Sequence, residues 1–269
     1  SHGEMSDYRF SAIDDVIVTV KQYQLTVNNE GVVEIDTAAE LTEFSRYVND
    51  GNTGVNAKII ANIELNKEQN DNPATNWEHW GDQTAPEGLV KWIPIGTALN
   101  NYAGTFDGAN FTISGIFVAD GESADQGLFG VTAADSRIKN IKLTESYING
   151  KEYVGGIVGR HYGIISNCNN SANIIGNSYV GGLAGMVNSE DGVSACYNSG
   201  MVRGSELAVG GLVGQMVGPI NNCYNTGTVS GNDKVGGLVG DHHKANQDNL
   251  ILNNCFNVGS VSGETDIGR

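Results

Sequence analysis

The chain of 269 residues carries 15 basic and 31 acidic residues, which gives a formal net charge of −16 at pH 7. A surface this acidic repels phosphate backbones, so the charge argues against a nucleic-acid partner. Glycine is abundant at 37 residues while proline is rare at 4, and there is no apolar run of about 18 residues, the length that a membrane-spanning helix needs.

The acidic residues are concentrated in the first half of the chain. Residues 1–150 hold 22 acids and 9 bases, whereas residues 151–269 hold 9 acids and 6 bases. Solubility accounts for such a surface, and an acidic docking face for a partner is the alternative.

Residues 1–30 contain two segments of β-strand character, VIVTV from Val16 and YQLTV from Tyr23. Both are rich in β-branched residues, and a turn follows them at Asn28–Gly31. These strands either open the domain or are the last strands of a preceding module.

Residues 31–125 begin with a predicted helix and continue with irregular strands. Thr37 and Glu40 form a capping box, and apolar residues follow at helical spacing until the run ends at Gly51, which predicts a helix over residues 36–50. A single helix ahead of a stack of β-coils would cover an otherwise open edge and core, so we expect it to act as a cap. The irregular first coils follow it, up to residue 125.

A polar loop from residue 66 to residue 88 carries the candidate ligand-binding residues Trp77, His79 and Trp80. Two tryptophans beside a histidine could stack against a sugar. The alternative is structural, with the tryptophans packing over the open end of the coil together with Trp92.

Residues 126–269 repeat two phrases. The first contains a Gly-Gly pair, and its four copies begin that pair at Gly155, Gly181, Gly210 and Gly236, with spacings of 26, 29 and 26 residues. The second is centred on cysteine, with spacings of 28, 27 and 32 residues, so all four cysteines occupy one repeat position: Cys168, Cys196, Cys223 and Cys255. A fixed period is typical of a repeat architecture.

Alignment on the cysteines shows which positions recur. An aliphatic residue precedes each cysteine by three positions, another follows it by six, and an asparagine follows it by two: Asn170, Asn198, Asn225 and Asn257. Short β-branched segments between Gly, Asn and Ser predict an all-β, parallel β-helix (β-solenoid) with about three strands per coil. The cysteines and asparagines then form structural ladders, and the uneven spacing before each cysteine predicts a bend or bulge there.

We expect the cysteines to be buried free thiols. Ile141 stands where the cysteine would fall in the preceding coil, which favours an inward apolar position. One or two disulfide bridges and a metal site are the alternatives, although neither a CxxC nor a Cys/His metal-ligand spacing is present.

The repeats resemble the GLUG motif, named for a G-L-x-G core and found in tandem in bacterial surface proteins, including IgA-cleaving metallopeptidases and adhesin-like proteins. The specific match runs from Gln126 to Arg269, and the preceding order AAELTEF, ANIEL, WIPIG, GTFDGANFTISG and GLFG is similar to the usual lead-in. The resemblance implies a right-handed β-helix in an exported, cell-surface protein. The last residues restart the phrase, so we expect the natural chain to continue.

No recognised catalytic signature accompanies the repeats. The chain lacks HExxH, GxSxG, a P-loop and a Rossmann fingerprint, and we expect no catalytic residue, cofactor or metal. The sequence therefore predicts a non-catalytic adhesion or structural module that presents a rod and its loops to a host glycan, a host protein or neighbouring domains. The alternative is a carbohydrate-active β-helix enzyme, a lyase or glycosidase, with paired carboxylates in its loops.

Overall fold

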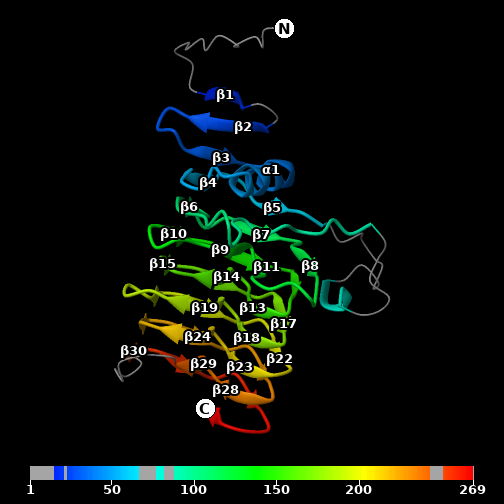
Figure 1. The fold of residues 1–269 in the computed structure, drawn as a ribbon, viewed down its shortest axis with the longest axis vertical. Coiled ribbons are helices and arrows are strands. Elements are labelled where there is room, and N and C mark those ends of the chain that lie inside the picture. Colours follow the sequence, from blue (N-terminus) through cyan, green and yellow to red (C-terminus); the bar gives the residue numbers. More distant parts are fainter. Residues whose placement is uncertain (1–14, 21–22, 67–76, 82–87, 243–250, 269) are drawn as a thin grey trace.

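The computed structural model describes residues 15–20, 23–66, 77–81, 88–242 and 251–268. Over these residues the chain winds into a parallel β-solenoid with one α-helix, α1 (Ala38–Asn49), near its N-terminal end (Figure 1). The predicted fold class is therefore confirmed. Most of residues 1–30 and of the loop at 66–88 lie outside the described residues.

Each regular coil contributes one short strand to each of five sheets, called here the first to the fifth. The first sheet contains β1 (Asp15–Val20), β2 (Tyr23–Asn28), β3 (Val33–Ile35), β4 (Ala57–Ile59), β6 (Thr105–Asp107), β10 (Arg137–Lys139), β15 (Ile164–Ser166), β20 (Val193–Ser194), β25 (Pro219–Asn221) and β30 (Ile251–Asn253). The second contains β5 (Ile63–Glu64), β7 (Thr112–Ser114), β11 (Lys142–Thr144), β16 (Asn169–Asn170), β21 (Tyr197–Asn198), β26 (Tyr224–Asn225) and β31 (Phe256–Asn257).

The remaining three sheets complete the coil. The third contains β8 (Phe117–Ala119), β12 (Tyr147–Asn149), β17 (Asn173–Gly176), β22 (Val202–Gly204), β27 (Val229–Ser230) and β32 (Val261–Ser262). The fourth contains β13 (Glu152–Gly155), β18 (Ser178–Gly181), β23 (Leu207–Gly210), β28 (Asp233–Gly236) and β33 (Ile267–Gly268). The fifth contains β9 (Phe129–Val131), β14 (Val158–His161), β19 (Ala184–Asn188), β24 (Val213–Val217) and β29 (Val239–His242).

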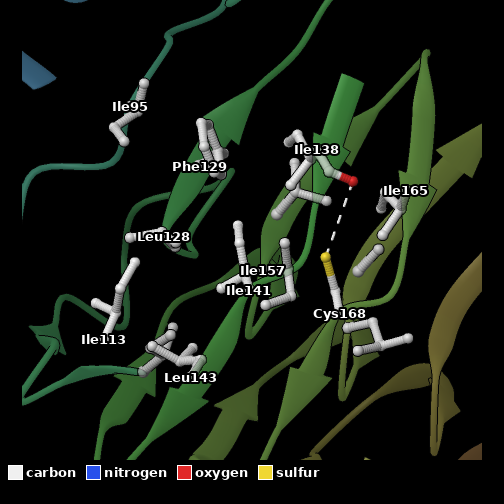
Figure 2. Packing of buried hydrophobic residues seen from close by; sticks show 14 of the residues in the cluster. Ile95, Ile113, Leu128, Phe129, Ile138, Ile141, Leu143, Ile157, Ile165 and Cys168 are labelled. Atoms are coloured by element: carbon white, nitrogen blue, oxygen red, sulfur yellow. Dashed lines mark hydrogen bonds between the residues drawn. The ribbon is translucent and has the colours of Figure 1, made fainter. Parts of the chain in front are cut away.

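The register keeps equivalent residues in line from coil to coil. In the first sheet the aliphatic residue three positions before the cysteine pairs with its counterpart in the next coil along the row Ile138, Ile165, Val193, Ile220 and Leu252. Rows of this kind fill the interior, where Ile141, Ile157 and Cys168 converge with the aliphatic side chains of neighbouring coils (Figure 2). The core is therefore one continuous apolar column along the rod.

The coil is divided more finely than the sequence predicts. About three strands per coil are expected, whereas the regular coils contain five. One reason is a single left-handed residue directly before the cysteine position, with φ between 52° and 58°, at Asn140, Asn167, Ala195, Asn222 and Asn254. This residue separates the first sheet from the second, and it is the bend that the uneven spacing predicts.

The Gly-Gly pairs lie where chain segments approach too closely to leave room for a side chain. A Cβ atom on Gly155 would lie 2.4 Å from the carbonyl oxygen of Val158, and one on Gly156 would lie 2.6 Å from the side chain of Asn170. The left-handed residue of this corner is Tyr153, two positions before Gly155, with a φ of 56°. Any larger residue at the pair would therefore force the coils apart.

The N-terminal end is closed by α1 and by antiparallel strands. β2 pairs antiparallel with β3, and β1 pairs antiparallel with β2. Thr37 is the N-cap of α1, and its side chain accepts a hydrogen bond from the Glu40 amide at 3.3 Å. Phe44 is fully buried, with its ring centroid 6.0 Å from that of Tyr102 and 5.9 Å from that of Phe106. The helix therefore covers the apolar column with its own apolar face.

Candidate functional site

A second, smaller apolar cluster lies outside the main core, on the outward face of the third sheet. Its buried members are Trp80, Phe117 and Tyr147, and the partly buried Trp77, Leu89 and Ile175 pack against it. The rings of Trp80 and Phe117 meet edge to face, with centroids 5.7 Å apart. A surface strand position that carries a large aromatic residue needs such a cover, because the neighbouring residues of β8 and β12 already fill the core.

The cover is a short turn that contains η2 (Trp77–His79), a 3-10 helix seen beside β8 in Figure 1. Its backbone lies close to the sheet, since a Cβ atom on Gly81 would come within 2.4 Å of the Tyr147 ring. Trp80 is only 2% exposed, whereas Trp77 is half-buried and His79 is exposed. Of the three predicted ligand residues, Trp80 anchors the turn, and Trp77 and His79 lie at its surface.

The structure differs in one respect from the alternative prediction that these tryptophans pack over the open end of the coil together with Trp92. Trp92 belongs to the main core, where its indole nitrogen donates to the carbonyl oxygen of Leu128 at 3.1 Å. Trp80 belongs to the separate cluster on the third sheet. The packing of Trp80 therefore covers the side of the rod and not the open end of the coil.

The cysteines stack in the core and are free thiols. Cys168, Cys196 and Cys223 are buried, and Cys255 is half-buried. The thiol of Cys168 donates to the Ser166 carbonyl at 3.3 Å and also lies 3.8 Å from the Ile138 carbonyl (Figure 2). Burial raises the pKa of Cys196 well above its ordinary value. The thiolate needed for nucleophilic or redox chemistry is therefore disfavoured at this position.

The asparagines two residues after the cysteines are hydrogen-bonded to one another along the rod. The amide of Asn170 donates to Asn198 at 2.9 Å, Asn198 donates to Asn225 at 2.9 Å, and Asn225 donates to Asn257 at 2.8 Å. The first three of these side chains are buried. The row ties each coil to the next, and its amides are already satisfied by their own neighbours.

A charged cluster that the sequence did not indicate joins residues of the fourth and fifth sheets, with Tyr153 on β13 and Arg160 on β14. Arg160 binds Asp125 through two hydrogen bonds of 2.5 Å and 2.6 Å, and its guanidinium lies 5.2 Å from the centroid of the Tyr153 ring. Tyr153 is stacked on Tyr179 at 5.0 Å. The hydrogen bonds to Asp125 raise the pKa of Arg160, and burial raises the pKa of Tyr153. The cluster is internally neutralised, which indicates a structural pair.

His161 is fully buried in the fifth sheet. Its Nδ1 lies 2.6 Å from the Thr132 hydroxyl, and its Nε2 has no partner among the described residues. Burial lowers the pKa of this imidazole to about 3, so it is neutral at physiological pH. Within the described ranges, no group of three or more His, Cys, Asp or Glu side chains is placed to share a metal ion.

Comparison with known proteins identifies the repeat. Residues 150–175 match the GLUG motif, which agrees with the resemblance drawn from the sequence. The chain is 28% identical over 136 residues to a "Putative Gly-rich membrane protein" of Evansella cellulosilytica, and 29% identical over 173 residues to "Halomucin" of Haloquadratum walsbyi. These alignments cover 49% and 62% of this chain, but only 14% and 2% of the two relatives.

A solved structure shares the fold. It is a Bacteroides ovatus protein described as a "putative immunoglobulin A1 protease", superposed with a TM-score of 0.65 over 90% of this chain and 85% of that chain. The two sequences are 18% identical, so the likeness concerns the fold alone. In the part of this chain that the structure describes, no helix has the length and apolar character of a membrane span.

Proposed function

We propose that this chain is a non-catalytic module of a cell-surface or secreted protein, in which a rigid rod presents the Trp77–Gly81 turn and the adjacent side of the rod to a glycan or protein partner. The observation that carries the proposal is the continuity of the stack. The same aliphatic, cysteine and asparagine rows run from coil to coil, and backbone pairing accompanies them in all five sheets. Such a structure resists bending and holds its surface features at fixed positions.

The arrangement of the reactive side chains supports a role without catalysis. The cysteines lie in the core, and Arg160 is bound to Asp125. Glycoside hydrolysis requires two carboxyl groups about 5 to 10 Å apart across a bound sugar. Several carboxylates are instead bound by nearby cations, amides or hydroxyl groups, as Asp107 is by Lys139 and Asn140 and Glu206 is by the Ser178 hydroxyl.

The extracellular location rests on the relatives. One is named as a membrane protein and the other as halomucin, and the chain corresponds to a small part of each. A rod of stacked coils fits a spacer or a display element within a longer surface protein. The binding partner of such an element is a glycan or protein outside the cell.

The experiment that tests this function joins a binding screen to a turnover assay. The purified chain is applied to a glycan array and to immobilised matrix proteins, and is incubated separately with neutral and acidic polysaccharides. We expect binding without release of unsaturated or reducing ends. Time-dependent product release that scales with protein concentration would instead establish the lyase or glycosidase alternative.

A further inference from the structure

The outward face of the third sheet continues from the tryptophan turn into a hollow farther along the rod. Ile175 packs against the cluster of Trp80 and Phe117. In the next coil its pairing partner is Arg203, and the partner of Arg203 in the coil after that is Ser230. One row of outward side chains therefore leads from the aromatic cluster to a polar region, and Figure 1 shows η2, β17 and β22 following one another along this side.

The polar region is a hollow of about 580 Å³. Its walls carry one cation, one carboxylate, two hydroxyl groups, a carboxamide and a thioether, from Arg203, Glu264, Ser205, Ser230, Asn232 and Met201. The side chains of Arg203, Ser205, Asn232 and Glu264 are exposed. Unlike Arg160, Arg203 forms no ion pair with any residue that the structure describes. The hollow thus exposes to solvent a cationic hydrogen-bond donor, an anionic acceptor and several neutral polar groups.

We propose that this side of the rod, from Trp77 to Glu264, binds an uncharged oligosaccharide. This inference names the ligand class for the adhesion role proposed above and rests on that role. A sugar ring packs its apolar face against the half-buried Trp77, because aromatic rings provide a flat apolar surface. Hydroxyl groups farther along the same oligosaccharide accept from Arg203 and donate to Glu264, and hydrogen bonds to charged groups are the stronger ones.

The charges of the protein favour an uncharged ligand over an acidic one. Arg203 and Glu264 balance each other in the hollow, while the whole chain has a net charge of −16. A polyanion would meet this unfavourable field, while the described lining of the hollow offers it one cation, Arg203. A neutral polyol has no such penalty and uses donors and acceptors together.

The spacing of the coils sets the size of the ligand. The turn lies over β8 and β12, and the hollow lies over β22 and β27 and the corner that precedes β33. Successive coils are separated by about 4.8 Å, so the two parts are roughly 10 to 20 Å apart. A monosaccharide cannot reach both parts, and the affinity of the wild-type chain therefore rises with the length of the oligosaccharide.

The test uses the full chain and two pairs of variants. Arg203→Gln and Trp77→Ala remove one contact from each part of the face, whereas Arg137→Gln and Tyr197→Ala change an exposed arginine on the first sheet and a half-buried tyrosine on the second. Binding to neutral oligosaccharides identified on the array is measured by titration calorimetry, with circular dichroism as the check on folding. We expect a loss of about tenfold or more for each variant of the first pair and less than about twofold for each control.

Three outcomes would overturn the proposal. Unchanged affinity in Arg203→Gln, an exposed substitution that leaves folding intact, places the site elsewhere, and the adhesion role survives if the wild-type chain still binds. Binding restricted to sulfated or uronic saccharides, and weakened by salt, shows that the ligand is acidic. Absence of binding to any glycan or protein removes both this inference and the proposed function.

Discussion

At the scale of single residues, Asn198 illustrates how the repeat stabilises itself. It has no exposed surface, and its amide nitrogen donates to the Gly200 carbonyl and to Asn225 at 2.9 Å each. Its oxygen accepts from Asn170 at 2.9 Å and from the Gly200 amide at 3.2 Å. One side chain therefore joins three coils and fixes a turn within its own.

We predict that Asn198→Ala lowers the free energy of unfolding by about 3 kcal/mol, because several buried groups lose their partner at once. Urea unfolding followed by circular dichroism measures the change. The matched control is Asn257→Ala at the half-buried end of the row, for which we expect about 1 kcal/mol. Equal losses in the two variants would show that burial of the amide row is not the source of the effect.

The lowered pKa of the buried His161 imidazole predicts that the stability of the fold depends on pH. Its pKa is about 3 in the folded chain, against an ordinary value of 6.5, so between these values the unfolded chain binds the proton and the folded chain does not. Stability is therefore complete above about pH 6.5 and falls as the pH is lowered toward 3. At about 1.4 kcal/mol per pH unit, we expect a loss of about 3 kcal/mol between pH 7 and pH 4.5.

The measurement is denaturant unfolding at a series of pH values, compared with His161→Phe. This variant removes the titrating group, and its stability should change little over the same range even if its absolute stability is lower. The range above pH 4.5 lies above the ordinary pKa of 3.8 of the Asp107 and Asp120 carboxyls, whose folded-state pKa values are lower still. A slope that persists unchanged in His161→Phe would assign the effect to other groups.

At the level of single elements, two positions in and next to α1 allow the contribution of helix capping to stability to be compared with that of core packing. Thr37 makes a solvent-exposed hydrogen bond at the helix N-terminus, whereas Phe44 is buried against Tyr102 and Phe106. We predict that Thr37→Ala costs about 1 kcal/mol and Phe44→Ala about 3 to 5 kcal/mol in free energy of unfolding. Both are measured by urea unfolding, and a cost in Thr37→Ala as large as that in Phe44→Ala would contradict the view that α1 is held mainly by the core.

At the scale of the whole molecule, burial of the thiols varies along the rod. Cys168, Cys196 and Cys223 are buried between coils on both sides, whereas Cys255 is half-buried and is therefore the most accessible of the four thiols. We predict that a thiol-reactive dye labels one cysteine quickly in the native protein and all four in denaturant. The variant Cys255→Ser should lack the fast phase. Rapid native labelling of four thiols would be incompatible with a closed stack.

The architecture can be predicted from the sequence because a solenoid stacks equivalent positions. Any residue that faces the core in one coil faces it in the next, so inward rows appear as a period in the sequence, as Ile141 and Cys168 show. The helix α1 can also be predicted from the sequence, since the capping box of Thr37 and Glu40 acts within one turn of the helix. Both signals are local or repeat at short range.

Features that depend on contacts between residues far apart in the sequence are seen only in the folded chain. Asp125 and Arg160 are 35 residues apart, and neither belongs to a motif that predicts their pairing. Trp80 is buried because Phe117 and Tyr147 face outward beneath it, and the face that links this cluster to Arg203 exists only once the coils are stacked. Such contacts join residues from different coils, and no periodicity within one coil records which loop folds against which side of the rod.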